Sequence, residues 1–434
     1  MYPNPQEALP LPPRPDLNHY RKRAKDLARA CASGDPSAIG TWAERWIRDL
    51  AELHAEGDRE RKTRDSARYA GKLAAFAANR LGANDCSLSQ AQFVIARAHG
   101  FESWPKLAHH IEAILEARTP VSAFEEAADA IVAGDRATIE RLLHEDPSLI
   151  RARSSREHRA TLLHYVAANG VENYRQETPA NIVEIARLLL DAGAEVDAEA
   201  EMYGGGATTL GLTVTSAHPR IAGVQIPLAE LLLERGARIS ERIVGYCLMN
   251  GCPEAAAYMA ERGAPVGLGA AAGIGRLDML EKKFDAARSF DDPAWRQEVG
   301  DAVIGAIWYD HEEIVSYLLD RGFDPATKVT GFGEIRTALH LASSEGRVSI
   351  VELLLRRGAP VNITDDVHHA TPMLWALYAW TSEKRRNLEP YPAIVRMLLN
   401  AGATVEAEWF DDDVVRAVPE LFEALTLRAG ENRG

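Results

Sequence analysis

The sequence predicts an all-α protein in which a solenoid of about seven to eight helix-turn-helix repeats follows a small helical domain. Apolar residues recur at helical spacing in short runs, and glycine separates one run from the next. From residue 123 onward this two-run unit returns along the chain, and the glycines that close successive units are 27 to 44 residues apart. Recurrence at such a period is the signature of a stacked repeat architecture.

The clearest unit is Thr337–Asn362, which reads TALHLASSEGRVSIVELLLRRGAPVN. Gly346 separates its two apolar runs, and Gly358 ends the second in the left-handed conformation that glycine adopts without strain. The runs consist of Leu339, Leu341 and Ala342, then Ile350, Val351, Leu353, Leu354 and Leu355. The unit therefore predicts two short antiparallel helices.

The opening of this unit resembles the ankyrin repeat, whose first helix begins Thr-Pro-Leu-His-x-Ala. The matching residues are Thr337, Leu339, His340 and Ala342, with Ala338 in place of the proline. The resemblance implies that Thr337 caps the first helix and that His340 hydrogen-bonds the neighbouring turns. His164 in the related stretch Thr161–Gly170 is expected to do the same. It also implies a concave face that is lined by first-helix ends and hairpin tips.

The expected units lie at 127–143, 161–194, 208–237, 243–264, 268–284, 299–322, 337–362 and a last one that closes at 403. Three expansions fall between paired helices, at Val171–Asn181, Arg220–Ile226 and Thr381–Tyr391. Expansions at the same structural place extend the same face of a stack, where they deepen a groove or meet a partner. The alternative is that the lengths of these loops vary without any role in binding.

The predicted domains are a proline-rich arm (1–15), a helical N-terminal domain (16–118), the solenoid (123–410) and a capping helix with a tail (411–434). The arm is an extended segment that packs across its own domain or remains a plain tail, with an SH3-type ligand as the alternative. Residues 89–107 resemble a recurrent N-terminal region of bacterial ankyrin-repeat proteins. Helices are expected at 17–32, 37–53, 72–81, 87–98 and 104–117.

The net charge of −14 argues against a nucleic-acid partner, since a phosphate backbone requires a basic face. Residues 1–119 carry +3 and the remainder −17, so the solenoid favours a neutral or basic partner. The four cysteines form no CxxC pair, which predicts neither a disulfide scaffold nor a zinc site and indicates a reducing cytoplasm. No signal peptide and no apolar run of membrane-spanning length is apparent.

The candidate site lies on the C-terminal half of the concave face, where aromatic residues occupy positions that are usually solvated. Aromatic side chains on such a face are typical binding hot spots. The candidate residues are Trp308, Tyr309, Ser344, Glu345, Tyr378 and Trp380 at helix ends, and Asp365, Asp366, His368 and His369 at a hairpin tip. No metal or other cofactor is expected, because adjacent residues on one turn seldom converge on an ion.

The leading hypothesis is a scaffold that docks a protein or peptide in this acidic, aromatic groove. One alternative is an enzyme for a small apolar substrate, in which Asp365, Asp366 and His368 would move protons. A second is a transcriptional regulator that uses the helix–turn–helix corner of the N-terminal domain. The sequence contains no GxSxG, HExxH or Rossmann glycine pattern, so no residue set proposes a reaction.

Overall fold

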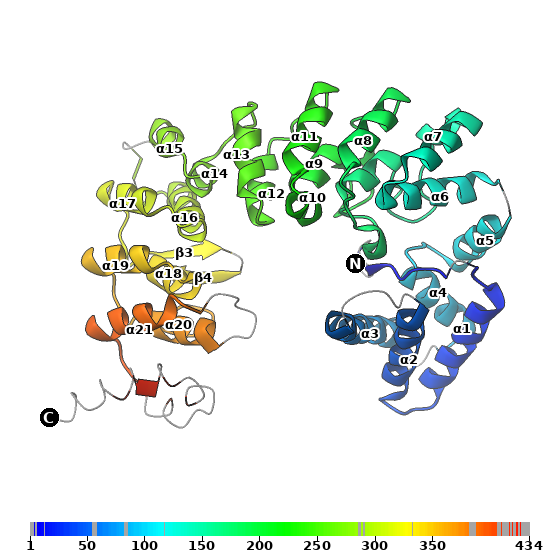
Figure 1. The fold of residues 1–434 in the computed structure, drawn as a ribbon. Helices are drawn as coiled ribbons and strands as arrows, with labels where there is room; N and C mark the ends of the chain where they lie inside the picture. Colours follow the sequence, from blue (N-terminus) through cyan, green and yellow to red (C-terminus); the bar gives the residue numbers. More distant parts are fainter. Residues whose placement is uncertain are drawn as a thin grey trace. The chain divides into compact units, whose positions relative to one another are not determined.

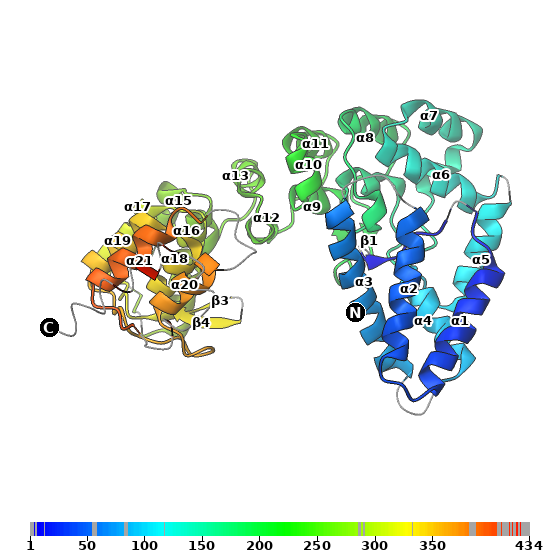
Figure 2. The same ribbon diagram turned by 60° about the horizontal axis from the view of Figure 1, so that its bottom comes forward.

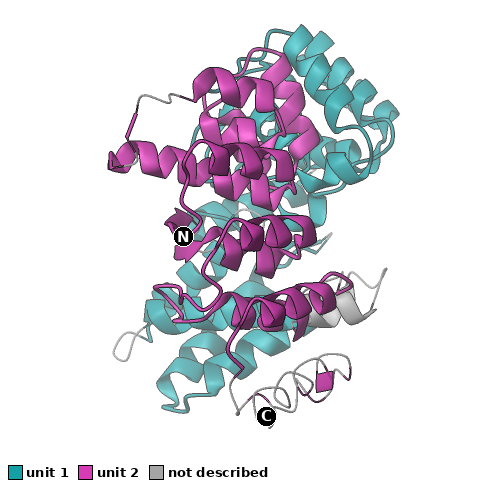
Figure 3. Cartoon of the chain, turned by 90° about the vertical axis from the view of Figure 1, so that its left-hand side faces the viewer, with its two compact units in different colours: residues 1–240 teal, residues 241–434 magenta. Residues whose placement is uncertain are grey.

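The computed structural model describes residues 4–405 and a few isolated residues beyond 405. Within 4–405 it leaves out residues 5–6, 13, 54–58, 82–85, 117, 285–287, 290, 332 and 382–387, and the side chains of 51–65. The described part is mostly helical and splits into two compact units, residues 1–240 (unit 1) and 241–434 (unit 2) (Figure 3). This division falls inside the segment predicted as one solenoid. The predicted capping helix and Asp411–Asp413 lie outside the continuously described residues.

Unit 1 begins with a helical bundle whose helices match the predicted ones closely (Figure 2). The charged stretch before Lys72 is also helical, so the third helix is longer than expected. The helices are α1 (Leu17–Ala32), α2 (Ala38–Leu53), α3 (Arg59–Leu81), α4 (Leu88–Ala98) and α5 (Trp104–Leu115). α1 packs on α2 and α4, and α3 packs on α2 and α4. Their shared core includes Leu27, Trp46 and Phe101.

The proline-rich arm packs across this bundle, as one of its two interpretations predicted. Ala8 and Leu9 are buried, and the Leu9 N–H donates to the carbonyl of Ala98 (2.8 Å). The carbonyl of Leu9 in turn accepts from Nδ1 of His99 (2.9 Å). Burial lowers the pKa of His99 to about 3, so its imidazole is neutral at pH 7. The arm therefore belongs to the core of unit 1.

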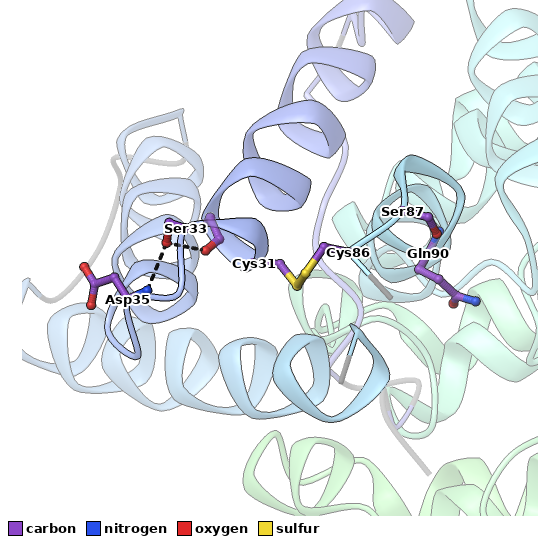
Figure 4. The surroundings of a disulfide bond; sticks show 7 residues. Cys31, Ser33, Asp35, Cys86, Ser87 and Gln90 are labelled. Atoms are coloured by element: carbon purple, nitrogen blue, oxygen red, sulfur yellow. Dashed lines mark hydrogen bonds between the residues drawn. A yellow bond between two sulfur atoms is a disulfide. The ribbon is translucent and has the colours of Figure 1, made fainter. Parts of the chain in front are cut away.

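A disulfide joins Cys31 at the end of α1 to Cys86 just before α4, with Cα atoms 5.5 Å apart (Figure 4). The expectation that these cysteines form no disulfide is wrong. They are 55 residues apart in sequence and meet because α1 and α4 pack against each other with these two ends together. Cys247 and Cys252 are buried and carry thiols, since neither takes part in a disulfide.

The rest of unit 1 consists of helix pairs. The first pair is α6 (Pro120–Ala133) with α7 (Arg136–Glu145), followed by a 3₁₀ turn at Pro147–Arg151. The second opens with a 3₁₀ helix, Leu162–Ala167, instead of the expected α-helix, and closes with α8 (Ile182–Asp191). The third is α9 (Thr209–Val214) with α11 (Gln225–Glu234), and a short helix α10 (Ala217–Ile221) stands between them. Two-residue strands β1 (Glu199–Ala200) and β2 (Ala207–Thr208) pair ahead of α9.

A buried cluster of charges ties the first helix pairs of unit 1 to the loops between them. Arg156 bridges Glu125 on α6 (2.8 Å) and Glu172 (2.9 Å), and Arg175 pairs with the same Glu125 (2.8 Å). The side chains of Arg156, Glu172 and Arg175 are no more than 4 % exposed. Glu172 and Arg175 belong to the expansion Val171–Asn181, which includes a 3₁₀ turn at Asn173–Arg175. The expansion is therefore held inside the unit by its charges.

Unit 2 repeats the paired-helix pattern in two layers (Figure 1). The first helices are α12 (Ile243–Met249), α14 (Leu268–Gly273), α16 (Pro293–Trp308), α18 (Ala338–Glu345) and α20 (Pro372–Thr381). The second helices are α13 (Pro253–Glu261), α15 (Leu277–Lys283), α17 (Glu312–Asp320), α19 (Val348–Arg356) and α21 (Tyr391–Asn400). Strands β3 (Lys328–Gly331) and β4 (Glu334–Thr337) form an antiparallel hairpin that packs on α16.

Glycine lets two of the first helices of unit 2 lie in close contact. A Cβ at Gly305 of α16 would lie 2.7 Å from the carbonyl oxygen of Gly269 on α14. A Cβ at Gly269 would in turn lie 2.9 Å from Cβ of Asp301. No larger residue fits at this crossing without moving the two helices apart.

The threonine–histidine pair of the repeat motif acts as a reciprocal helix cap, as the resemblance implied. The backbone N–H of Thr337 donates to Nδ1 of His340 (3.2 Å), while Nε2 of His340 donates to the carbonyl of Ala370 (3.0 Å) in the next repeat. Thr161 and His164 repeat this arrangement, with Nε2 of His164 donating to Ala207 (3.2 Å). These histidines are structural and connect neighbouring hairpins.

The two histidines predict a specific loss of stability in acid. Burial lowers the pKa of His164 and of His340 to about 4, whereas an unfolded histidine titrates near 6.5. Between these values the unfolded chain binds more protons, so the free energy of unfolding falls as the pH drops from about 6.5 towards 4. Each histidine accounts for up to about 3 kcal/mol of that fall.

Urea unfolding of the wild-type chain and of His340→Gln between pH 7 and 4.5 measures this effect. The variant is expected to be less stable at pH 7 but to lose less stability on acidification than the wild type. An identical dependence on pH in both proteins would show that His340 is protonated as readily in the folded chain as in the unfolded one.

Candidate functional site

The candidate site of unit 2 is the side of its first helices that the second helices leave uncovered. We call it the first-helix face and define it by the outward side chains of α16, α18 and α20, the tip of the β3–β4 hairpin and the loop 363–371. Tyr378 of α20 is the most exposed aromatic residue named for this face, with 66 % of its surface accessible. Ile335 and Val367 at the tips are 36 % and 46 % exposed.

Trp308 and Tyr309 at the end of α16 are half-buried and partly engaged within unit 2. Trp308 lies beside Ile304 and Leu341 and against the hairpin residues Val329 and Gly331. The Tyr309 hydroxyl donates to the carbonyl of Leu248, and burial raises the pKa of that phenol. Each side chain therefore combines an anchored part with an accessible part, which suits a rigid contact point.

Trp380 and Ser344 do not lie on this face. Trp380 is only 4 % exposed and packs inside unit 2, so the expectation that it stands beside Tyr378 on the surface is wrong. Ser344 is also 4 % exposed: its hydroxyl donates to Leu341 (3.2 Å), and its carbonyl accepts from the Tyr391 hydroxyl (2.9 Å). Its neighbour Glu345, by contrast, is partly exposed.

Asp365 holds the hairpin loop together and is 1 % exposed. Its carboxylate accepts hydrogen bonds from the backbone of Val367, His368 and Ala370 (2.6–2.9 Å) and from the indole of Trp375 (3.0 Å). Burial alone would raise the pKa of Asp365, but these N–H donors outweigh it and hold the pKa well below its usual range. Asp365 therefore stabilises its own loop and is not available to a partner, so the expectation that it belongs to the accessible site is wrong.

His368 of the loop and two charged residues of β4 form a small cluster around Trp375 of α20. His368 meets the ring of Trp375 edge-on (5.6 Å between centroids), and the guanidinium of Arg336 lies 4.7 Å from the same ring. Glu334 approaches both His368 and Arg336 (3.5 Å each). Glu334 and Arg336 belong to a hairpin whose tip the sequence indicated, whereas Trp375 was not predicted as part of this face. The signal for Trp375 is its place in the helix that directly follows the loop.

Asp366 and His369 complete the loop, and both are exposed. Asp366 forms an ion pair with Lys328 of β3 and donates its backbone N–H to Ile335 (3.0 Å). His369 has a positive φ of 54°, which turns the chain between the loop and α20. In the described part of the chain, no three His, Cys, Asp or Glu side chains are grouped so as to hold a metal ion.

The site residues identified from the sequence thus separate into two groups. Trp308, Tyr309 and Tyr378 present accessible aromatic surface, and Glu345, Asp366, His368 and His369 lie at its polar margin. Ser344, Asp365 and Trp380 have structural roles inside the unit. The accessible set offers contact surface and charge, with no nucleophile–base pair among its assigned contacts.

A sequence model of ankyrin repeats, in three copies, matches residues 303–408. This segment consists of ankyrin repeats. All ten candidate residues lie within it, between 308 and 380. Ankyrin repeats are generally protein–protein interaction modules. No curated protein matches the chain. Among the described helices, none has both the length and the apolar character that crossing a bilayer requires.

Proposed function

We propose that the chain is a binding scaffold whose first-helix face in unit 2 docks a protein or peptide partner. The observation that carries the proposal is Tyr378, a large aromatic side chain that is 66 % exposed on ankyrin repeats, with the half-buried Trp308 and Tyr309 on the same face. Exposed tyrosine and tryptophan supply large contact area at small entropic cost and dominate the energetics of interfaces.

The charge of unit 2 favours a neutral or basic partner. Residues 241–434 carry 30 acidic and 20 basic side chains, so the field around the unit is negative at pH 7. A field of this sign steers a basic partner towards the unit and disfavours polyanions such as nucleic acid. This excess of charge acts mainly on the rate of association and on specificity.

Tyr378→Ala is expected to weaken partner binding strongly while leaving the fold intact, because an exposed side chain adds little to the core. A hot-spot residue contributes 2 kcal/mol or more, so the dissociation constant should rise about thirtyfold. The measurement is recovery of bound protein from a native lysate by the tagged full-length chain, followed by titration of the recovered partner.

Leu115→Ala is the matched control, since Leu115 is 54 % exposed and lies on α5 in unit 1. The control should recover the partner as the wild type does. Trp308→Ala, with its fold checked by circular dichroism, should weaken binding as well. Equal recovery by the wild type, Tyr378→Ala and a folded Trp308→Ala would refute the assignment of the partner to this face.

A further inference from the structure

One row of side chains on α16 combines a carboxylate with an aromatic anchor. Gln297, Asp301, Ile304 and Trp308 are spaced four, three and four residues apart, so they lie on the same side of the helix. At 1.5 Å per residue, Asp301 and Trp308 are about 10 Å apart along the helix axis. Ile304 lies between them and contacts the hairpin at Gly331.

Asp301 has no cationic partner in the described part of the chain, where no ion pair includes it. Its Oδ1 accepts one hydrogen bond, from the amide of Gln297 (2.8 Å), which also donates to Thr330 of the hairpin (3.2 Å). Asp301 is exposed, so its carboxylate is open to a partner. Partial desolvation by the surrounding chain raises the pKa of Asp301, and the nearby charge of Glu298 adds to the rise. The carboxylate therefore faces outward without a compensating positive charge from the described part of the chain.

Other acidic groups near this face are already compensated within the chain. Asp366 pairs with Lys328, Glu334 approaches Arg336 and His368, and Asp365 is enclosed by N–H donors. Where the pKa of another described carboxyl group departs clearly from its usual value, it is lowered. Asp301 is thus the carboxylate on α16 that would gain most from a positive charge supplied from outside.

We propose that the partner presents a basic side chain to Asp301 and an apolar side chain to Trp308, about 10 Å apart. In an extended segment, at about 3.3 Å per residue, this distance separates residues three positions apart. This inference rests on the proposed function, because it uses the same face. It adds the sign of the charge, the position of the charge and the spacing of the two recognised side chains.

Selection from a phage-displayed library of random twelve-residue peptides on the immobilised full-length chain tests the proposal. Peptides enriched on the wild type but not on a folded Trp308→Ala variant should share a lysine or arginine three positions from an apolar residue. Binding of such a synthetic peptide should weaken five- to tenfold in Asp301→Asn and depend less on salt. Glu281→Gln on α15 removes one exposed negative charge from the other helix layer and should bind as the wild type does.

The possible outcomes distinguish the assignment of Asp301 from the proposal that the first-helix face binds a partner. Enriched peptides that need Trp308 but bind Asp301→Asn with unchanged affinity would overturn the assignment of Asp301 and leave the face itself standing. Equal weakening by Glu281→Gln and Asp301→Asn would also overturn it, because the effect would then be one of overall charge. Enrichment that is the same on the wild type and on folded Trp308→Ala and Tyr378→Ala variants would overturn both proposals.

Discussion

Replacing Glu172 by glutamine is expected to destabilise unit 1 by about 3–5 kcal/mol, because it leaves two buried arginines to share Glu125 as their remaining buried carboxylate. Glu172 is fully buried between Arg156 (2.9 Å) and Arg175 (3.7 Å), and Nε2 of His158 lies 3.3 Å from the same carboxylate oxygen. Burial alone would raise the pKa of Glu172, but the two arginines and the hydrogen bond from His158 hold that pKa well below its usual range. The carboxylate is therefore ionised at pH 7.

Differential scanning calorimetry and hydrogen exchange of residues 156–176 measure this effect. Asp129→Asn is the matched control, because Asp129 binds the same Arg175 (2.7 Å) but has a side chain that is 63 % exposed. An ion pair whose carboxylate is exposed to water contributes little, about 0–1 kcal/mol, so the control should unfold close to the wild type. Equal stabilities of Glu172→Gln and Asp129→Asn would show that the buried cluster does not hold unit 1 together.

Local signals in the sequence predicted the helices and the caps well. The helices of the N-terminal bundle begin and end within a residue or two of their expected bounds, apart from the start of α3, because caps such as Ser87 act within one turn. The pair Thr337 and His340 was recognisable for the same reason. The start of α16 was not predicted, although Asp292 followed by Pro293 is a helix-start signal. Because the helix was expected to begin later, the row of side chains that contains Asp301 was not recognised either.

The orientation of α20 could not be predicted from its sequence. The helix reads PMLWALYAWT and is apolar on nearly every side, so periodicity does not distinguish the exposed Tyr378 from the buried Trp380. The role of Asp365 was also out of reach, because its four donors come together only when the loop folds back on itself. Sequence periodicity assigns faces only where polar and apolar residues alternate.

Contacts between distant segments were the other class of feature that the sequence concealed. Glu125 and Arg156 are 31 residues apart, and each resembles an ordinary surface charge when only its neighbours in sequence are considered. An extension of the binding face was one of two interpretations of the expansion Val171–Asn181, yet this segment places Glu172 and Arg175 in the interior. Whether the other two expansions contribute to binding stays a prediction.

Reducing the disulfide between Cys31 and Cys86 is expected to destabilise the N-terminal bundle by about 4 kcal/mol in the chain-entropy treatment of a 55-residue separation. The bond ties the end of α1 to the start of α4. At the opposite ends of these helices, the rings of Tyr20 and His99 meet edge-on with their centroids 5.0 Å apart. Without the bond, only noncovalent packing holds α1 on α4, and the unfolded chain regains the entropy of an open loop.

Urea unfolding of the full-length chain with and without a phosphine reductant, together with hydrogen exchange of α1 and α4, measures the effect. The double variant Cys31→Ser/Cys86→Ser should resemble the reduced wild type and should not respond to the reductant. Cys252→Ala is the control, because it leaves the disulfide in place and should still lose stability on reduction. Two free thiols at Cys31 and Cys86 in the purified chain, or equal stability with and without the reductant, would show that this link does not hold the bundle together.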